Sequence, residues 1–241
     1  MPFSLRLLAL PLALSACSVA PAGVDIHDPY EARNRAVHDF NKQVDETLFG
    51  GNDSAGPAVD PELSALVINF ADNAAGPGMV LNGLLQGDIG GAATNTLRFV
   101  LNTTIGVGGL FDPADAIGLY EDDTDFGQTL TVWGVPEGAY LELPILGPST
   151  ERDLAGRIVD AIIDPLDRFG TRPQKDYGTL AGLAARGLKR DQFGDTVDSV
   201  LYDSADSYAQ QRLLYLQNRR FELGETSDED AVDPYEELFG Q

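Results

Sequence analysis

Apolar residues recur at spacings of three and four in short segments, and glycine and proline separate these segments. Val37, Phe40, Val44 and Leu48 follow this spacing, which places them on one face of a helix over residues 29–49. The same kind of pattern predicts helices over residues 61–75, 79–86, 88–102, 150–169, 178–190, 191–202 and 204–222. After the first seventeen residues no apolar run reaches eighteen residues, so we expect no conventional transmembrane helix.

Glycine and proline mark where these helices end. Gly76-Pro77-Gly78 predicts a break between two helices, because proline removes a backbone N–H and glycine is a poor helix former. The stretch 103–147 contains eight glycines and predicts turns and short helical pieces, with one short strand at Tyr140–Leu143. Thr150 and Asp153 have the spacing of a capping box at the start of the next helix. The fold class is therefore mostly α with Gly/Pro-rich loops and at most a short strand pair.

The only cysteine, Cys17, follows a basic residue and an apolar run at the start of the chain. This order is typical of a secretory signal, and Leu14-Ser15-Ala16-Cys17 resembles a bacterial lipobox. We predict a signal peptide over residues 1–16, a lipid anchor at Cys17 and a lipidated tether over residues 17–28. Ser18 resembles the signal for outer-membrane sorting, which predicts a lipid anchor on the periplasmic face. The alternative is a cysteine within an ordinary cleavage region.

The charge balance excludes several classes of function. The chain has 16 Lys and Arg against 38 Asp and Glu, a formal net charge of −22. Such a chain lacks the basic footprint of a general nucleic-acid binder, and its charge opposes electrostatic docking on anionic lipid. A single cysteine also excludes an intrachain disulfide and a cysteine-rich zinc site.

The sequence offers no recognisable catalytic or metal site. His27 and His38 are the only histidines; we interpret both as surface residues, and no G-x-S-x-G motif accompanies them. The acidic run over residues 122–125 does not fit the EF-hand pattern, and we interpret it as a solvated turn. We therefore expect no enzyme activity, no metal and no cofactor.

Several motifs occur in an order that resembles one known family, the MlaA (VacJ) outer-membrane phospholipid-transport lipoproteins. The similarity spans roughly residues 28–222, and the ordered set is far more specific than any one motif. The main motifs are Asp28-Pro29-Tyr30-Glu31-Ala32-Arg33-Asn34-Arg35, Asn82-Gly83-Leu84-Leu85-Gln86-Gly87-Asp88, the stretch from Arg98 to Ala114, Asp125-Phe126-Gly127-Gln128-Thr129-Leu130, Leu143-Pro144-Ile145-Leu146-Gly147-Pro148-Ser149-Thr150, and Tyr215-Leu216-Gln217 followed by Arg219-Arg220. Arg186-Gly187-Leu188 is loosely similar to a family stretch near its channel.

The resemblance implies a ring- or disc-like, monotopic helical domain over residues 29–223. In this family, phospholipid misplaced in the outer leaflet passes through an amphipathic channel to a soluble periplasmic carrier, and the ring sits against trimeric porins. Two alternatives remain for this chain. One is a structural or scaffolding envelope lipoprotein that conducts no lipid, and the other is an envelope hydrolase.

Two further segments are candidate functional elements. Gly106, Gly108 and Gly109 are a candidate hinge or gate, because glycine changes its backbone angles at little cost; the alternative is an ordinary turn-rich connection. The acidic tail over residues 224–241 contains a possible apolar stripe that suits helix-in-groove recognition of the carrier; the alternative is a solvated tail. The candidate docking residues are Val232, Tyr235, Leu238 and Phe239.

Overall fold

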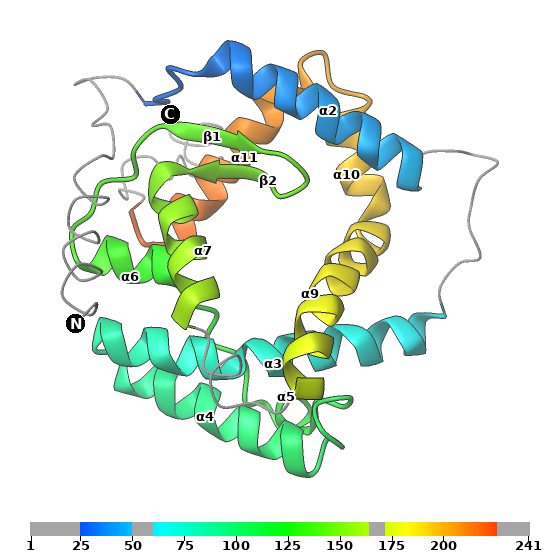
Figure 1. The fold of residues 1–241 in the computed structure, drawn as a ribbon, viewed down its shortest axis with the longest axis vertical. Coiled ribbons are helices and arrows are strands. Elements are labelled where there is room, and N and C mark those ends of the chain that lie inside the picture. The colour runs from blue at the N-terminus through cyan, green and yellow to red at the C-terminus, as the bar shows by residue number, and fades with distance from the viewer. Residues whose placement is uncertain (1–24, 50–59, 164–171, 226–241) are drawn as a thin grey trace, which may run out of the picture.

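The computed structural model describes residues 25–49, 60–163 and 172–225, with only the backbone over 172–179. Its elements surround a centre in a ring: α2 and the β-hairpin lie opposite α3 and α4, and α7 and α9 form the sides (Figure 1). The elements are α2 (Glu31–Phe49), α3 (Pro61–Gln86), α4 (Ile89–Thr104), α5 (Pro113–Ala116), α6 (Phe126–Val132), β1 (Tyr140–Leu143), β2 (Gly147–Thr150), α7 (Glu151–Ile163), α9 (Arg172–Gln192), α10 (Gly194–Leu201) and α11 (Ser207–Glu222). The predicted fold class, helices with one short strand pair, is confirmed.

The predicted break at Gly76-Pro77-Gly78 is wrong, because α3 continues through Pro77 to Gln86. Proline costs the helix one backbone hydrogen bond, and close packing against α4 offsets this loss. A Cβ at Gly76 would lie 3.4 Å from the Phe99 ring, and one at Gly83 would lie 3.2 Å from the Ala92 side chain. The glycines therefore allow α4 to pack closely against α3, and they do not end α3.

The β-hairpin joins α2 to the rest of the ring. β1 and β2 pair antiparallel, with Tyr140 opposite Thr150. The Asn34 amide of α2 donates to the Tyr140 carbonyl at 3.0 Å and accepts from the Glu142 N–H at 3.1 Å. The Asn34 side chain thus completes the hydrogen bonds of the β1 backbone, and its own burial is satisfied. The Tyr140 ring packs with Tyr208 and Leu216 in a small apolar cluster.

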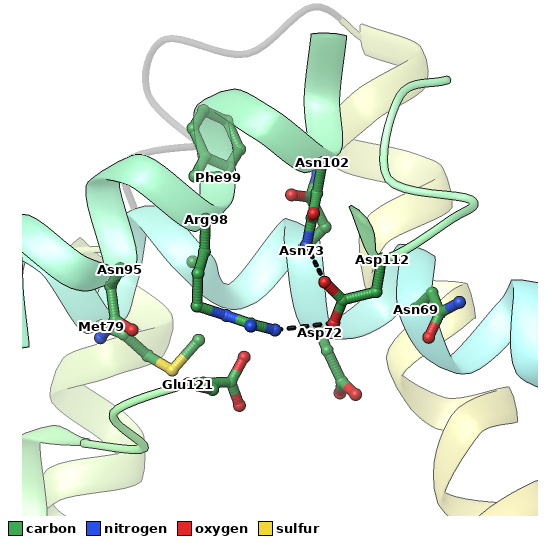
Figure 2. A pocket seen from close by; sticks show the side chains of 11 residues that line it. Asn69, Asp72, Asn73, Met79, Asn95, Arg98, Phe99, Asn102, Asp112 and Glu121 are labelled. Atoms are coloured by element: carbon green, nitrogen blue, oxygen red, sulfur yellow. Dashed lines mark hydrogen bonds and ion pairs between the residues drawn. The ribbon is translucent and has the colours of Figure 1, made fainter. Parts of the chain in front are cut away.

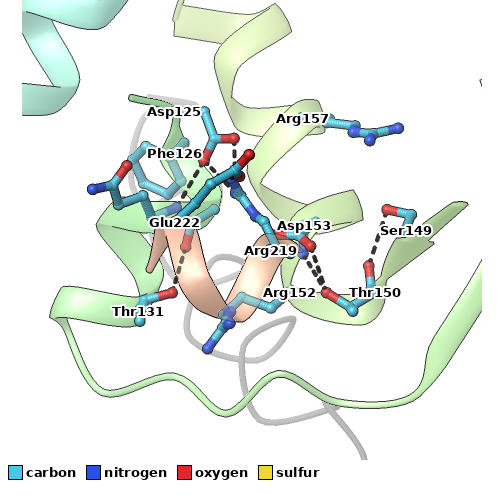
Figure 3. A network of polar contacts seen from close by, with 12 residues as sticks. Asp125, Phe126, Thr131, Ser149, Thr150, Arg152, Asp153, Arg157, Arg219 and Glu222 are labelled. Carbon is cyan, nitrogen blue, oxygen red and sulfur yellow. Dashed lines mark hydrogen bonds and ion pairs between the residues drawn. The ribbon is translucent and has the colours of Figure 1, made fainter. Parts of the chain in front are cut away.

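A network of polar contacts joins α6, α7 and α11 (Figure 3). The predicted N-cap at Thr150 is confirmed, because the Asp153 N–H donates to Thr150 Oγ1 at 3.1 Å. In place of the reciprocal backbone bond of a capping box, the Thr150 hydroxyl donates to the Asp153 carboxylate at 3.0 Å. Arg219 of α11 pairs with Asp153 at 3.1 Å and with Asp125 at 2.8 Å. Asp125 is also the N-cap of α6. Asp125 therefore has a structural role, which corrects the interpretation of this residue as part of a solvated turn, whereas Asp122 and Asp123 are exposed as expected.

Candidate functional site

The described part of the chain buries polar side chains and exposes many large apolar ones. On α4, Asn95, Arg98 and Asn102 are buried, whereas Leu97 and Val100 are 55% and 50% exposed. A helix in a water-soluble domain normally shows the opposite arrangement. Isolated exposed apolar residues are ordinary, but a contiguous apolar surface marks an interaction with a partner or a membrane. The outer face of α4 therefore suits an apolar environment.

This surface continues beyond the end of α4 into the following loop. Ile105 and Val107 are 66% and 62% exposed, and Ile117 and Tyr120 are exposed in the same way. No helix within the described ranges is long and apolar enough to cross a membrane.

The largest cavity described has a volume of about 430 Å³ and is bounded by α2, the β1–β2 turn, α9, α10 and α11. This volume lies within the usual range for small-molecule sites. Much of the lining is apolar. The apolar side chains include Val44, Leu48, Phe49, Ile145, Leu146, Leu183, Val197 and Leu201. Leu48, Ile145 and Leu183 are more than half exposed, so the cavity offers apolar surface that the chain itself does not cover.

Two cations line this cavity without an ion pair among the described residues. They are Lys42 of α2 and Arg186 of α9. The Lys42 ammonium lies 5.0 Å from the centre of the Tyr202 ring, a contact that leaves its positive charge uncompensated. In a chain of net charge −22, two unpaired cations beside an apolar wall are unusual. Together they provide the chemistry that binds the anionic group of an amphiphile.

The third cation of the cavity, Arg190, is already neutralised. Its guanidinium contacts Asp45 at 2.6 and 2.7 Å and Asp198 at 2.6 Å. Asp45 also accepts a hydrogen bond from the Tyr202 hydroxyl at 2.9 Å. Hydrogen bonds from Asp45 and Asp198 raise the pKa of Arg190, against the opposing effect of burial. This group fastens α9 to α2 and leaves Lys42 and Arg186 as the available charges.

His38 forms part of the same wall, and its predicted surface position is wrong. Its side chain is 3% exposed and its Nδ1 lies 3.9 Å from Glu142, while Nε2 lies 2.9 Å from the Ser207 hydroxyl. The helical spacing of α2 could have indicated this burial, because His38 lies one turn after the buried Asn34. The contacts join α2, β1 and α11.

The candidate hinge follows α4 as a hydrogen-bonded turn. Gly108 and Gly109 have φ of 75° and 93°, a region that favours glycine. Their N–H groups donate to the carbonyls of Thr103 and Asn102 at 3.0 and 2.9 Å. Gly106 is close-packed, since a Cβ there would lie 2.3 Å from the Phe111 carbonyl oxygen. The three glycines thus share one turn, whose apolar side chains belong to the exposed surface.

Asp112 fastens this turn to α4 (Figure 2). Its carboxylate accepts from Arg98 at 2.7 Å, from Asn102 at 2.9 Å and from the Asp115 N–H at 2.9 Å. Partial burial raises the pKa of Asp112, but the hydrogen bonds from Asp115, Asn102 and Arg98 outweigh it and lower the pKa. The small cavity here has a volume of only about 20 Å³, so this cluster holds the backbone in place and has no room for a ligand.

Known proteins are similar to this chain in sequence and in fold. The model of the MlaA lipoprotein family matches residues 26–222. The chain belongs to this family. The match includes the cavity, the hairpin and the turn after α4, and it confirms the resemblance found in the sequence motifs.

Similar proteins occur in Escherichia coli and in Rickettsia typhi. The chain is 31% identical over 226 residues to the intermembrane phospholipid transport system lipoprotein MlaA of Escherichia coli, covering 90% of this chain and 88% of that protein. It is 35% identical over 160 residues to an uncharacterized protein of Rickettsia typhi, where the match covers 66% of this chain and 63% of that protein. The match therefore spans less than two thirds of the Rickettsia relative.

A solved structure has the same fold. That structure is described as the structural basis for maintenance of bacterial outer membrane lipid asymmetry. The TM-score is 0.65 at 29% sequence identity, and the match covers 81% of this chain and 98% of that one. The ring of helices and the hairpin of this chain therefore belong to the same fold as that solved structure.

The remaining predicted site residues lie outside the described residues. These are the lipid anchor Cys17 and the docking residues Val232, Tyr235, Leu238 and Phe239. Arg186 could be suspected from its loose similarity to a family stretch, whereas nothing in the sequence singles out Lys42. Only the ring brings these two together, because they lie on helices far apart in the chain.

Proposed function

We propose that this chain is an outer-membrane lipoprotein that removes mislocalised phospholipid from the outer leaflet and passes it to a periplasmic carrier. The observation that carries the proposal is the cavity in which Lys42 and Arg186 face an apolar wall. A phospholipid combines a phosphate with acyl chains, and this cavity presents a complement to both parts. Membership of the MlaA lipoprotein family supports the proposal.

The exposed apolar surface supports a position within the membrane interface. We infer that acyl chains on Cys17 anchor the chain at the periplasmic face of the outer membrane. The face of α4 that carries Leu97 and Val100 then contacts lipid. Because each buried methylene contributes about 0.8 kcal/mol, several acyl chains overcome the repulsion between an acidic protein and anionic lipid.

We propose three kinds of partner: phospholipid, trimeric porins beside the ring, and a soluble periplasmic carrier. The tail residues Val232, Tyr235, Leu238 and Phe239 would dock the carrier. Transport of intact lipid forms and breaks no covalent bond, so the proposed function is not enzymatic and uses no cofactor. Comparing carrier binding to the full chain with binding to a chain ending at Gly224 tests the docking role. Equal affinities would contradict it.

The direct test is lipid binding and lipid removal. The full acylated chain is purified in detergent, and the phospholipid that accompanies it is identified and counted by mass spectrometry. We expect about one phospholipid per chain, and about tenfold less after the double change Lys42→Gln and Arg186→Gln, since two charge contacts are lost. Lys189→Gln is the matched control, because Lys189 lies on the same helix but pairs with Asp72 at 3.0 Å.

The same variants are then compared in cells by measuring phospholipid in the outer leaflet. The double variant should accumulate outer-leaflet phospholipid, whereas the Lys189→Gln variant should behave as the parent. Normal lipid asymmetry without the chain, together with no bound lipid in the purified protein, would favour the structural lipoprotein instead. Hydrolysis of phospholipid by the purified chain would favour the envelope hydrolase.

A further inference from the structure

The charges around the cavity indicate which class of phospholipid headgroup it binds. We propose that the cavity between α2 and α9 selects phospholipids with a net negative headgroup, such as phosphatidylglycerol, over zwitterionic phosphatidylethanolamine. This inference rests on the proposed function and adds the class of headgroup. It depends on the balance between cations and carboxylates that face the same space.

The charged or titratable groups in the described lining are Lys42, Arg186, Arg190, Asp45 and His38. Lys42 and Arg186 have no ion pair among the described residues, whereas Arg190 pairs with Asp45 at 2.6 Å and with Asp198, which lies outside the lining, at 2.6 Å. His38 is the remaining titratable group, and its Nδ1 faces the buried Glu142 at 3.9 Å. Lys42 and Arg186 therefore leave positive charge available to a ligand in the described lining.

Asp45 is the only carboxylate among the described residues of the lining, and its oxygens are occupied. One oxygen accepts from Arg190 at 2.7 Å, and the other accepts from Arg190 at 2.6 Å and from the Tyr202 hydroxyl at 2.9 Å. Within the described lining, an ammonium group would therefore meet Lys42 and Arg186 and no free carboxylate. A buried or half-buried charge without a partner is costly. The site therefore disfavours the ethanolamine headgroup by repulsion as well as by lack of a partner.

A glycerol headgroup meets no such obstacle. Its phosphodiester pairs with Lys42 or Arg186, and its hydroxyls carry no charge. Gln211 of α11 lines the cavity and is half-buried, and its amide can both donate to and accept from a hydroxyl. Both lipid classes carry the phosphate, so the difference between them comes from the ammonium of one headgroup and the uncharged hydroxyls of the other.

The test compares the two headgroups on the full acylated chain in neutral detergent. Phosphatidylglycerol and phosphatidylethanolamine with identical acyl chains are titrated in mixed micelles against a bound fluorescent phospholipid. We expect phosphatidylglycerol to bind about tenfold more tightly, the size of effect that one partly solvated charge contact gives. Inorganic phosphate and glycerol 3-phosphate at the same concentration should displace little of the probe, because they lack acyl chains.

Two variants change the charge of the cavity in a defined way. Arg186→Gln should reduce the preference to about threefold, since one of two cations remains. Gln211→Glu supplies a carboxylate for the ammonium and should remove or reverse the preference. The matched controls are Lys189→Gln on α9 and Gln210→Glu on α11. Lys189 pairs with Asp72 and Gln210 is exposed, and neither lines the cavity.

The outcomes separate this inference from the proposed function. Equal binding of the two lipids by the parent chain would overturn the headgroup preference and leave lipid binding intact. A preference unchanged by both Arg186→Gln and Gln211→Glu would overturn its assignment to this cavity. Displacement by free phosphate as effective as by lipid would show a phosphate site instead. Binding of neither lipid would contradict the proposed function itself.

Discussion

Arg98 and Arg186 lie on neighbouring sides of the ring of helices, on α4 and α9 (Figure 1), yet their surroundings differ completely. Arg98 on α4 is buried, pairs with Asp112 at 2.7 Å and also donates to the Leu119 carbonyl. Arg186 on α9 is exposed and has no ion pair among the described residues. Arg98 therefore stabilises the fold, whereas Arg186 is available to a ligand.

The same contrast extends to the two regions. Around Arg98, the Asp112 carboxylate accepts from Arg98, Asn102 and the Asp115 N–H, and Leu97 and Val100 of α4 are exposed. Around Arg186, apolar side chains line a cavity of about 430 Å³, and two cations there have no ion pair among the described residues. The cluster around Arg98 therefore stabilises the fold, and the surroundings of Arg186 suit ligand binding. Changes in the first should lower the free energy of unfolding, and changes in the second should alter ligand affinity.

The largest effect is expected at Arg98. Arg98→Gln should lower the free energy of unfolding by about 4 kcal/mol, because it removes one partner of a buried ion pair and leaves Asp112 uncompensated. The measurement is denaturant unfolding of the full chain in detergent, followed by circular dichroism. The exposed pair Lys189–Asp72 is the control, and Lys189→Gln should cost about 0.5 kcal/mol. Similar losses in both variants would remove the distinction.

The partner carboxylate should give a slightly smaller effect with a defined pH dependence. Asp112→Asn should cost about 3 kcal/mol at neutral pH. Because the folded state lowers the pKa of Asp112 below its ordinary 3.8, its stabilisation is present above that value and is lost as the pH falls through the folded pKa. Unfolding measured from pH 7 down to pH 3 should therefore show the parent approaching the variant. A constant difference over this range would contradict the assignment.

The turn after α4 gives a third effect. Gly109→Ala should cost about 2 kcal/mol, because its φ of 93° is left-handed and a Cβ would lie 2.5 Å from Asn73. Gly108 has a φ of 75° with open space around it, so Gly108→Ala should cost about 1 kcal/mol. The difference between the two variants isolates the contact with Asn73. Equal costs would mean that Asn73 moves away freely.

These two alanine variants also test the proposed hinge. If the turn must change shape during transport, the substitutions should reduce lipid removal. The measurement is the amount of phospholipid in the outer leaflet, which should rise. Gly108→Ala leaves the backbone N–H that donates to Thr103, which Gly108→Pro would remove. Normal lipid removal by a folded Gly108→Ala chain with a stiffened turn would favour the ordinary connection.

Much of the fold could be predicted because it depends on local signals. Apolar spacing predicted α2 and α11, and the Thr150–Asp153 spacing predicted the start of α7. The break at Pro77 was wrong because tertiary packing of α4 overrides a local helix signal. The burial of His38 was missed because its partners, Glu142 and Ser207, come from distant parts of the chain.

The site was less predictable for the same reason. The motifs indicated the family, but Lys42 and Arg186 are more than 140 residues apart and become neighbours only when α9 packs beside α2. A lone lysine and a lone arginine on amphipathic helices look like any solvated charge. What distinguishes them is the absence of a carboxylate partner among the described residues, which only three-dimensional structure reveals.

The smallest effect on stability should come from Arg186, and it sharpens the comparison most. Arg186→Gln is the same substitution as Arg98→Gln, yet it should change the free energy of unfolding by less than about 0.5 kcal/mol, because an exposed side chain without an ion pair stabilises little. The substitution should instead weaken lipid binding. Unfolding with and without saturating phosphatidylglycerol separates the two terms, since a ligand stabilises only the state that binds it. The parent should gain more from the lipid than the variant, while the lipid-free curves coincide. A lipid-free loss comparable to that of Arg98→Gln would make Arg186 a structural residue and leave the cavity without its headgroup contact.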